Sequence, residues 1–222
     1  MGICGTVVHM FLAYAGEIGS VGPHNTPVTV THNDHQLAGS GAAAPANMER
    51  FAISLSSELT DELDGAAEYL LVDVEAILVA ALARAMERVL GAGQAYVDIT
   101  VANERAGSWL AAVQRVQLHC VSAAELDATD MLAAVGQALA AADADLTGDC
   151  DVLFSYGTTP IGDDHPGAAH AVELRGYRCD GVLQLDWWFD VRRVDSYTVE
   201  ELAEQFPLAL IELSTEATPA SR

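Results

Sequence analysis

Basic residues are scarce in this sequence. Its 222 residues include 10 lysines and arginines against 32 aspartates and glutamates, which gives a formal net charge of −22. Nucleic acids and anionic membrane surfaces attract proteins through clustered basic side chains, so this balance argues against both as partners. An acidic excess spread evenly along a chain is typical of a solubility trait.

Cysteines are few and scattered. Cys4, Cys120, Cys150 and Cys179 form no CxxC pair, which excludes zinc-ribbon and thioredoxin-type sites. With 51% hydrophobic residues, a chain of this length can build a core without disulfides. We expect reduced, mostly buried thiols in one large domain or, alternatively, in two small ones.

Several functional signatures are also missing. The sequence contains no P-loop, GxGxxG, GxSxG or kinase motif, so nucleotide-binding and α/β-hydrolase functions have no support. The apolar segment from Ile3 to Ala15 is too short to span a bilayer and lacks the basic residues of an export signal. We therefore expect a cytoplasmic protein with no membrane partner, no bound metal and no cofactor.

The stretch from Cys150 to Leu213 has the clearest pattern. An apolar run from Val152 to Tyr156 predicts a strand that ends at Gly157. Alternating residues on both sides of Asp180-Gly181 predict a β-hairpin. Thr198 with Glu201 three residues later predicts a capped helix start. That helix continues with apolar residues at helical spacing, namely Leu202, Phe206, Leu210 and Leu213.

Three motifs in this stretch resemble the C-terminal part of the condensation and epimerisation domains of nonribosomal peptide synthetases. FSYGT at Phe154 to Thr158 is similar to the FNYLG strand of that family. DGVL at Asp180 to Leu183 is similar to its D-G-x-L turn, and TVEELAEQF at Thr198 to Phe206 is similar to its closing helix. Upstream segments also match the C-terminal lobe, so the resemblance runs from about Arg50 to Leu213; these segments are Ile53 to Leu63, Val72 to Gly91 and Val97 to Leu118.

The resemblance implies an α/β (α+β) fold: a mixed β-sheet with helices packed on one face, as in one lobe of a chloramphenicol-acetyltransferase-like protein. We expect a domain over residues 50–214. An apolar segment and a connector rich in Gly, Pro and Ser precede it over residues 1–49, and a disordered tail follows over 215–222. Helix N-caps are expected at Ser57 or Thr60, at Asp73, and at Thr129 or Asp130.

The resemblance also shows what is missing. The HHxxxDG motif, which carries the catalytic histidines of the family in its other lobe, does not occur in these 222 residues. Thr100 stands near the position of an acidic residue in epimerisation relatives and cannot act as a base. Ser155 replaces the asparagine of FNY, whereas Tyr156 is retained. The candidate substrate-binding residues are Tyr156, Ser155, Thr100 and Trp188, the last because one of two adjacent tryptophans must face away from the core.

Other polar clusters leave several interpretations open. His32, Asp34 and His35 are the candidate catalytic residues, because His32 and Asp34 would share one face of an extended strand. The alternatives for them are a polar loop or metal binding. A second cluster before the hairpin, Asp163, Asp164, His165 and His170, is typical of a solvated loop or of a metal or substrate contact. His119 and Cys120 point to opposite faces of a strand and cannot form a nucleophile pair.

Two principal hypotheses follow. The first is a stand-alone C-lobe-like protein in nonribosomal peptide or polyketide secondary-metabolite biosynthesis, including antibiotic biosynthesis. It would bind a carrier (thiolation) protein, a complementary lobe or a second copy of itself through an exposed apolar face. The second is a small cyclase or acyltransferase in which His32, Asp34 and His35 lie near Tyr156. A third is a decayed domain without activity.

Overall fold

The computed structural model describes residues 9–10, 28–29, 47–100, 113–142, 150–157 and 170–219. It contains a two-stranded ladder and a six-stranded mixed sheet in the order β3-β8-β7-β6-β4-β5. The strands are β1 (His9–Met10), β2 (Val28–Thr29), β3 (Met48–Ser54), β4 (Gly93–Thr100), β5 (Val113–Cys120), β6 (Val152–Gly157), β7 (Val172–Cys179) and β8 (Val182–Asp190). The helices are α1 (Ser57–Leu70), α2 (Val74–Leu90), α3 (Ala128–Ala140) and α4 (Ser196–Glu216).

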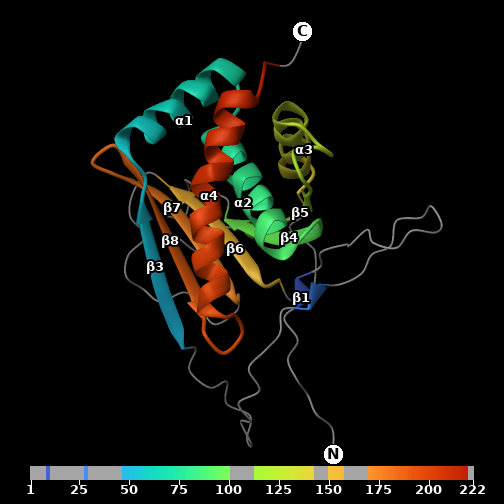
Figure 1. Ribbon diagram of the computed structural model, residues 1–222, viewed down its shortest axis with the longest axis vertical. Helices are drawn as coiled ribbons and strands as arrows, with labels where there is room; N and C mark the ends of the chain where they lie inside the picture. The colour runs from blue at the N-terminus through green and yellow to red at the C-terminus, as the bar shows by residue number, and fades with distance from the viewer. Residues whose placement is uncertain are drawn as a thin grey trace, which may run out of the picture.

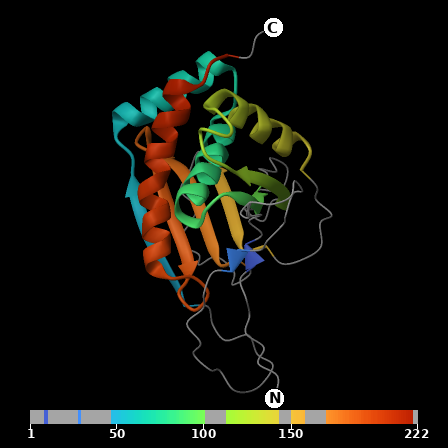
Figure 2. The ribbon, with the colours of Figure 1, turned by 45° about the vertical axis from the view of Figure 1, so that its right-hand side comes forward.

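All four helices lie on one side of the large sheet (Figures 1 and 2). Strand pairing is parallel in β4–β6 and β6–β7 and antiparallel in β3–β8, β7–β8 and β4–β5. The expected mixed sheet with helices on one face is therefore confirmed. Helix α4 runs along the sheet beside α2 (Figure 1), and α2 lies between α4 and α3 (Figure 2).

The helix-covered face of the sheet is apolar. Alternate residues of β8 point into this layer, and Trp187 at 0% exposure meets the Phe206 ring of α4 edge-on, with 5.9 Å between the ring centroids. Helix α2 is buried on all sides from Ala76 to Met86, where Arg84 is the one charged residue. A helix buried all round packs within the core instead of lying on its surface.

The hairpin forms at the predicted turn. Cys179 pairs with Val182, leaving a two-residue loop. Asp180 and Gly181 both adopt positive φ, 51° and 83°. A type I′ turn needs positive φ at both central positions, and Asp-Gly accepts it at low cost.

Helix starts were predicted less accurately. The α1 cap is Ser56, which accepts a hydrogen bond from the Leu59 amide at 3.1 Å, and not Ser57 or Thr60. The α4 cap is Asp195 and not Thr198, since its carboxylate accepts from the Tyr197 amide at 2.9 Å. In both helices a side chain earlier in the sequence, on an extended backbone, reaches the free amides first.

Other element boundaries also differ from the expected ones, with Asp73 as the exception. Asp127 caps α3, in place of Thr129 or Asp130, whereas Asp73 precedes α2 as expected. Strand β3 begins at Met48, inside the expected connector. Helix α4 continues to Glu216, past the expected end of the domain, and the Thr218 amide donates to Thr129 Oγ1 at 2.9 Å.

Candidate functional site

The face of the sheet opposite the helices carries polar side chains. Strand alternation places Asp186 and Trp188 of β8, Glu173 and Arg175 of β7, and Ser155 of β6 on this face. No helix of the described residues covers it, and we call it the helix-free face. All five are buried, with exposures between 4% and 7%. Most of the described residues that point this way are charged or hydrogen-bonding, so the expected apolar face does not lie on these strands.

Trp188 lies at the centre of a ladder of charged pairs. The Arg50 and Arg175 guanidinium carbons stand 5.7 and 5.5 Å from the centroid of its ring. Arg50 also pairs with Asp186 at 2.8 Å, and Arg175 pairs with Glu173 at 2.6 Å. Each guanidinium thus has both a carboxylate and an aromatic face. For Arg175, whose side chain is 6% exposed, these contacts offset part of the cost of burial, whereas the Arg50 side chain is 37% exposed. We call these five side chains the Trp188 ladder.

The predicted substrate-binding residues are split between the two faces. Ser155 of β6 lies opposite Arg175 of β7 in the strand pairing. Continuing the β4–β6 register by one residue places Thr100 of β4 opposite Ser155 on the neighbouring strand. Ser155, Thr100 and Trp188 therefore share the helix-free face. Tyr156 lies on the other face, because successive strand residues point in opposite directions.

Tyr156 takes part in the helical layer. Its ring lies 3.2 Å from the place where a Cβ on Gly176 would stand. Its hydroxyl accepts a hydrogen bond from Arg178 Nε at 3.4 Å, and Arg178 also pairs with Asp64 of α1. Tyr156 therefore contributes to the contact between β7 and α1, and it does not face the same space as Ser155.

Ser155 is buried on this face. Its side chain is 4% exposed, and its hydroxyl has no hydrogen-bond partner. Leaving a buried hydroxyl unsatisfied costs about 1–3 kcal/mol. Trp187 Nε1 in the apolar layer and Ser214 Oγ of α4 are buried without a partner as well, so this state by itself does not mark a binding site.

A second cluster lies toward the β5 edge of this face. The Asp98 carboxylate of β4 accepts from Arg115 Nε at 2.7 Å and Arg115 Nη2 at 3.1 Å, and His170 Nε2 stands 3.0 Å from it. Burial alone would raise the pKa of Asp98, but the hydrogen bonds from Arg115 and His170 hold it below its ordinary value. Asp98 is thus an ionised acceptor at neutral pH.

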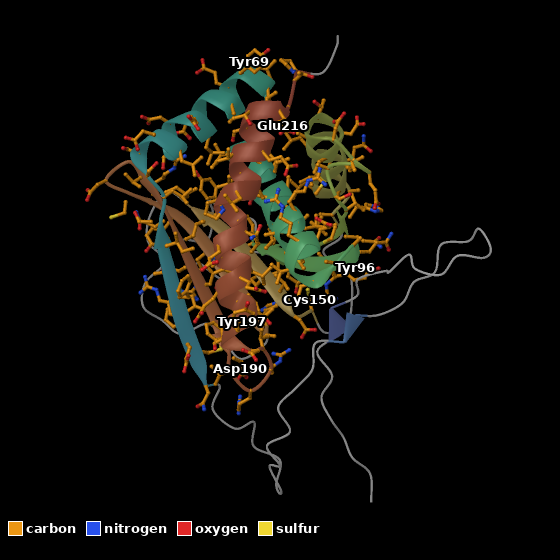
Figure 3. The ribbon with its side chains drawn as sticks, in the orientation of Figure 1. Tyr69, Tyr96, Cys150, Asp190, Tyr197 and Glu216 are labelled. Atoms are coloured by element: carbon orange, nitrogen blue, oxygen red, sulfur yellow. The ribbon has the colours of Figure 1, made fainter. Side chains whose placement is uncertain are left out.

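Cys150 borders this cluster. Its thiol donates to the Tyr96 carbonyl at 3.3 Å, and Figure 3 shows the two residues side by side where β6 begins. Burial raises the pKa of Cys150 to about 11. The neutral thiol is therefore its stable form, and Cys150 is not an activated nucleophile.

Sequence reasoning identified part of this arrangement. It named His170 only as one member of a polar loop and did not foresee its pairing with Asp98, which lies 72 residues earlier. His119 is exposed and Cys120 is fully buried, on opposite faces as expected. His32, Asp34, His35, Asp163, Asp164 and His165 lie outside the described residues, so the catalytic role of the first three stays a prediction.

Within the described ranges, no group of three His, Cys, Asp or Glu side chains is arranged to hold a metal ion. In the same part of the chain no helix is long and apolar enough to cross a membrane.

Comparison with known proteins places this geometry in context. No family model matches the sequence. The chain is 31% identical over 219 residues to one of the subunits of the phenolphthiocerol/phthiocerol polyketide synthase of Mycobacterium tuberculosis, and the same holds for the corresponding protein of Mycobacterium bovis. The match covers 78% of this chain but only 15% of the polyketide synthase protein. The chain is thus related in sequence to one segment of a much longer protein.

Solved structures show the same fold. The epimerization domain from the third module of tyrocidine synthetase B has a TM-score of 0.59 at 13% identity, covering 79% of this chain and 52% of that one. VibH, a condensation enzyme of nonribosomal peptide synthesis, has a TM-score of 0.58 at 17% identity with the same coverages. A condensation domain from the enacyloxin polyketide synthase has a TM-score of 0.54 at 14% identity, covering 79% of this chain and 42% of that one.

A six-stranded mixed sheet with helices on one face, matched to about half of each isolated domain, fits a C-terminal-lobe-like fragment. The chain therefore has the fold of a condensation and epimerisation domain of the nonribosomal peptide synthetases, over one lobe.

Proposed function

We propose that the protein acts in nonribosomal peptide or polyketide secondary-metabolite biosynthesis as a lobe whose helix-free face docks on a complementary lobe. The observation that carries the proposal is the match of this chain to about half of each isolated condensation or epimerisation domain. On the helix-free face, Val113 of β5 is an exposed apolar side chain that a partner can contact directly.

The charges limit the kind of partner. Each described arginine forms an ion pair inside the protein: Arg50, Arg84, Arg88, Arg115, Arg175, Arg178, Arg192 and Arg193. The excess charge of the chain is strongly negative. Like charges across an interface are unfavourable, so a partner surface that is neutral or basic fits best.

The proposal is tested with two substitutions on opposite sides of the sheet. Val113 of β5 is 41% exposed on the helix-free face, and Leu208 of α4 is 52% exposed on the helical layer. Size-exclusion chromatography with light scattering would measure the protein alone and mixed with the lobe and carrier proteins encoded beside it. We expect a dimer or a complex with the wild type, loss of it with Val113→Arg, and no change with Leu208→Arg.

Other outcomes separate the alternatives. A complex broken by Leu208→Arg but not by Val113→Arg would place the partner on the helices and contradict the proposal. A complex formed with a carrier protein but with no lobe would favour the carrier-binding role. A wild-type protein that stays a monomer in every mixture would also contradict docking through this face.

A further inference from the structure

We propose that His170, held by Asp98, is a general base that takes a proton from water or a small alcohol attacking an activated acyl group. The proposal goes beyond partner docking, because it assigns a chemical step to residues of this chain. It rests on three observations: a fixed imidazole, an imidazole nitrogen left open, and a charge-balanced carboxylate behind it.

The imidazole is fixed by an atom that can only accept. His170 Nε2 stands 3.0 Å from Asp98 Oδ2. An ionised carboxylate has no proton to give, so Nε2 carries the hydrogen and donates it. In the neutral ring, Nδ1 must then hold the free electron pair. This is the logic by which a carboxylate orients a catalytic histidine for proton transfer.

The second nitrogen is open. The hydrogen bond to Asp98 is the one polar contact of the His170 side chain with the part of the chain that the structure describes. The side chain is 16% exposed, and Nδ1 is not among the buried atoms without a partner. A small acceptor molecule can therefore approach the free electron pair from solvent.

The carboxylate behind the ring is itself held. Arg115 of β5 binds both of its oxygens, at 2.7 and 3.1 Å, and the Asp98 side chain is 10% exposed. The guanidinium balances the negative charge of the carboxylate. The other titratable neighbour is Cys150, which burial keeps as a neutral thiol. Asp98 of β4 and Arg115 of β5 thus hold the imidazole of His170, which stands just before β7.

The step balances without a cofactor. The acceptor oxygen attacks the acyl carbonyl and forms a new C–O bond while its proton moves to Nδ1. The bond from the carbonyl carbon to the leaving group then breaks, and the leaving group takes the proton from the imidazolium. An ester and water yield an acid and an alcohol, and His170 returns to its neutral form. A positioned general base contributes about 10²- to 10⁴-fold to such a step.

The first test determines which tautomer the His170 imidazole adopts. Nitrogen-15 NMR of the imidazole groups in the wild-type protein at pH 8, assigned with His170→Gln, should show a proton on Nε2 and none on Nδ1. In Asp98→Asn the two tautomers should mix, which a purely structural contact between folded elements would not require. A proton on Nδ1 in the wild type would overturn the proposal.

The second test measures catalytic turnover, and it needs no partner protein. 4-Nitrophenyl acetate serves as the acyl donor and water as the acceptor. We expect hydrolysis above the buffer rate that falls at least ~10²-fold in His170→Gln. His119→Gln is the matched control, because His119 is an exposed histidine of β5 on the same face of the sheet. Equal rates in the wild type and His170→Gln would overturn the proposal, whatever the docking experiments show.

Discussion

The two faces of the sheet keep their side chains in place by different forces, and the adjacent residues Trp187 and Trp188 show the contrast. Trp187 packs against the Phe206 ring in an apolar layer, where close contact and exclusion of water stabilise it. Trp188 lies among charged pairs, of which Arg175 and Glu173 are buried together and Asp186 is buried beside the exposed Arg50. Loss of an apolar side chain leaves a cavity, whereas loss of one member of a charged pair leaves its partner buried without a compensating charge.

The largest expected effect is on the apolar face. Trp187→Ala should lower the free energy of unfolding by ~5 kcal/mol, the upper end for a buried tryptophan, because 0% of the residue is exposed and the cavity lies under a helix. Urea unfolding followed by circular dichroism measures the loss. Trp188→Ala is the matched control and should lose less, since it opens the face that no described helix covers. Equal losses would mean that the two faces are packed alike.

The next effect tests the pairing inside the Trp188 ladder. Arg175→Met should cost ~3 kcal/mol, since it leaves Glu173 charged and buried, with a side chain 8% exposed. The double substitution Glu173→Leu with Arg175→Met should recover at least half of that loss, because an apolar pair needs no compensation. Equilibrium unfolding of the four proteins gives the coupling energy. Additive losses would show that the two side chains do not stabilise each other.

A smaller effect concerns acid. The pKa values of Asp98 and Asp190 lie below the ordinary value of 3.8, because arginine hydrogen bonds outweigh burial. Folding therefore favours the ionised carboxylates. Their stabilisation is complete well above pH 4 and is lost as the pH falls through the folded pKa values. Unfolding free energies measured from pH 7 to pH 3 should decline less steeply in Asp190→Asn than in the wild type, and an unchanged slope would contradict the assignment.

The smallest effect leaves the fold intact. Burial raises the pKa of Cys120 to about 12 and that of Cys150 to about 11, whereas Cys179 is exposed at the hairpin turn. Iodoacetamide at pH 8 should label Cys179 quickly and the two buried thiols only after unfolding. Peptide mass spectrometry measures the extent of labelling at each site. Fast labelling of Cys150 in the native protein would mean that the cluster near Asp98 is open to solvent.

The fold was predictable to the extent that local patterns determine it. The Asp-Gly turn and the alternation in β8 each depend on neighbouring residues, and each is seen in the structure. The helix caps were misplaced because several side chains in a row can accept from the first amides. Only the backbone conformation decides which one does.

The candidate site was predictable only in part. Ser155 and Tyr156 were expected in one substrate-binding site, although successive strand residues point to opposite faces. A tryptophan that faces away from the core was foreseen without its arginine neighbours. The sequence by itself determined the acidic balance, the Asp-Gly turn and the alternation of β8, because these depend on composition and on short-range periodicity, whereas the one-lobe fold was implied by the resemblance of its motifs to a known family. Only the tertiary structure brought Asp98, Arg115 and His170 together, because strand order joins residues that no local pattern connects.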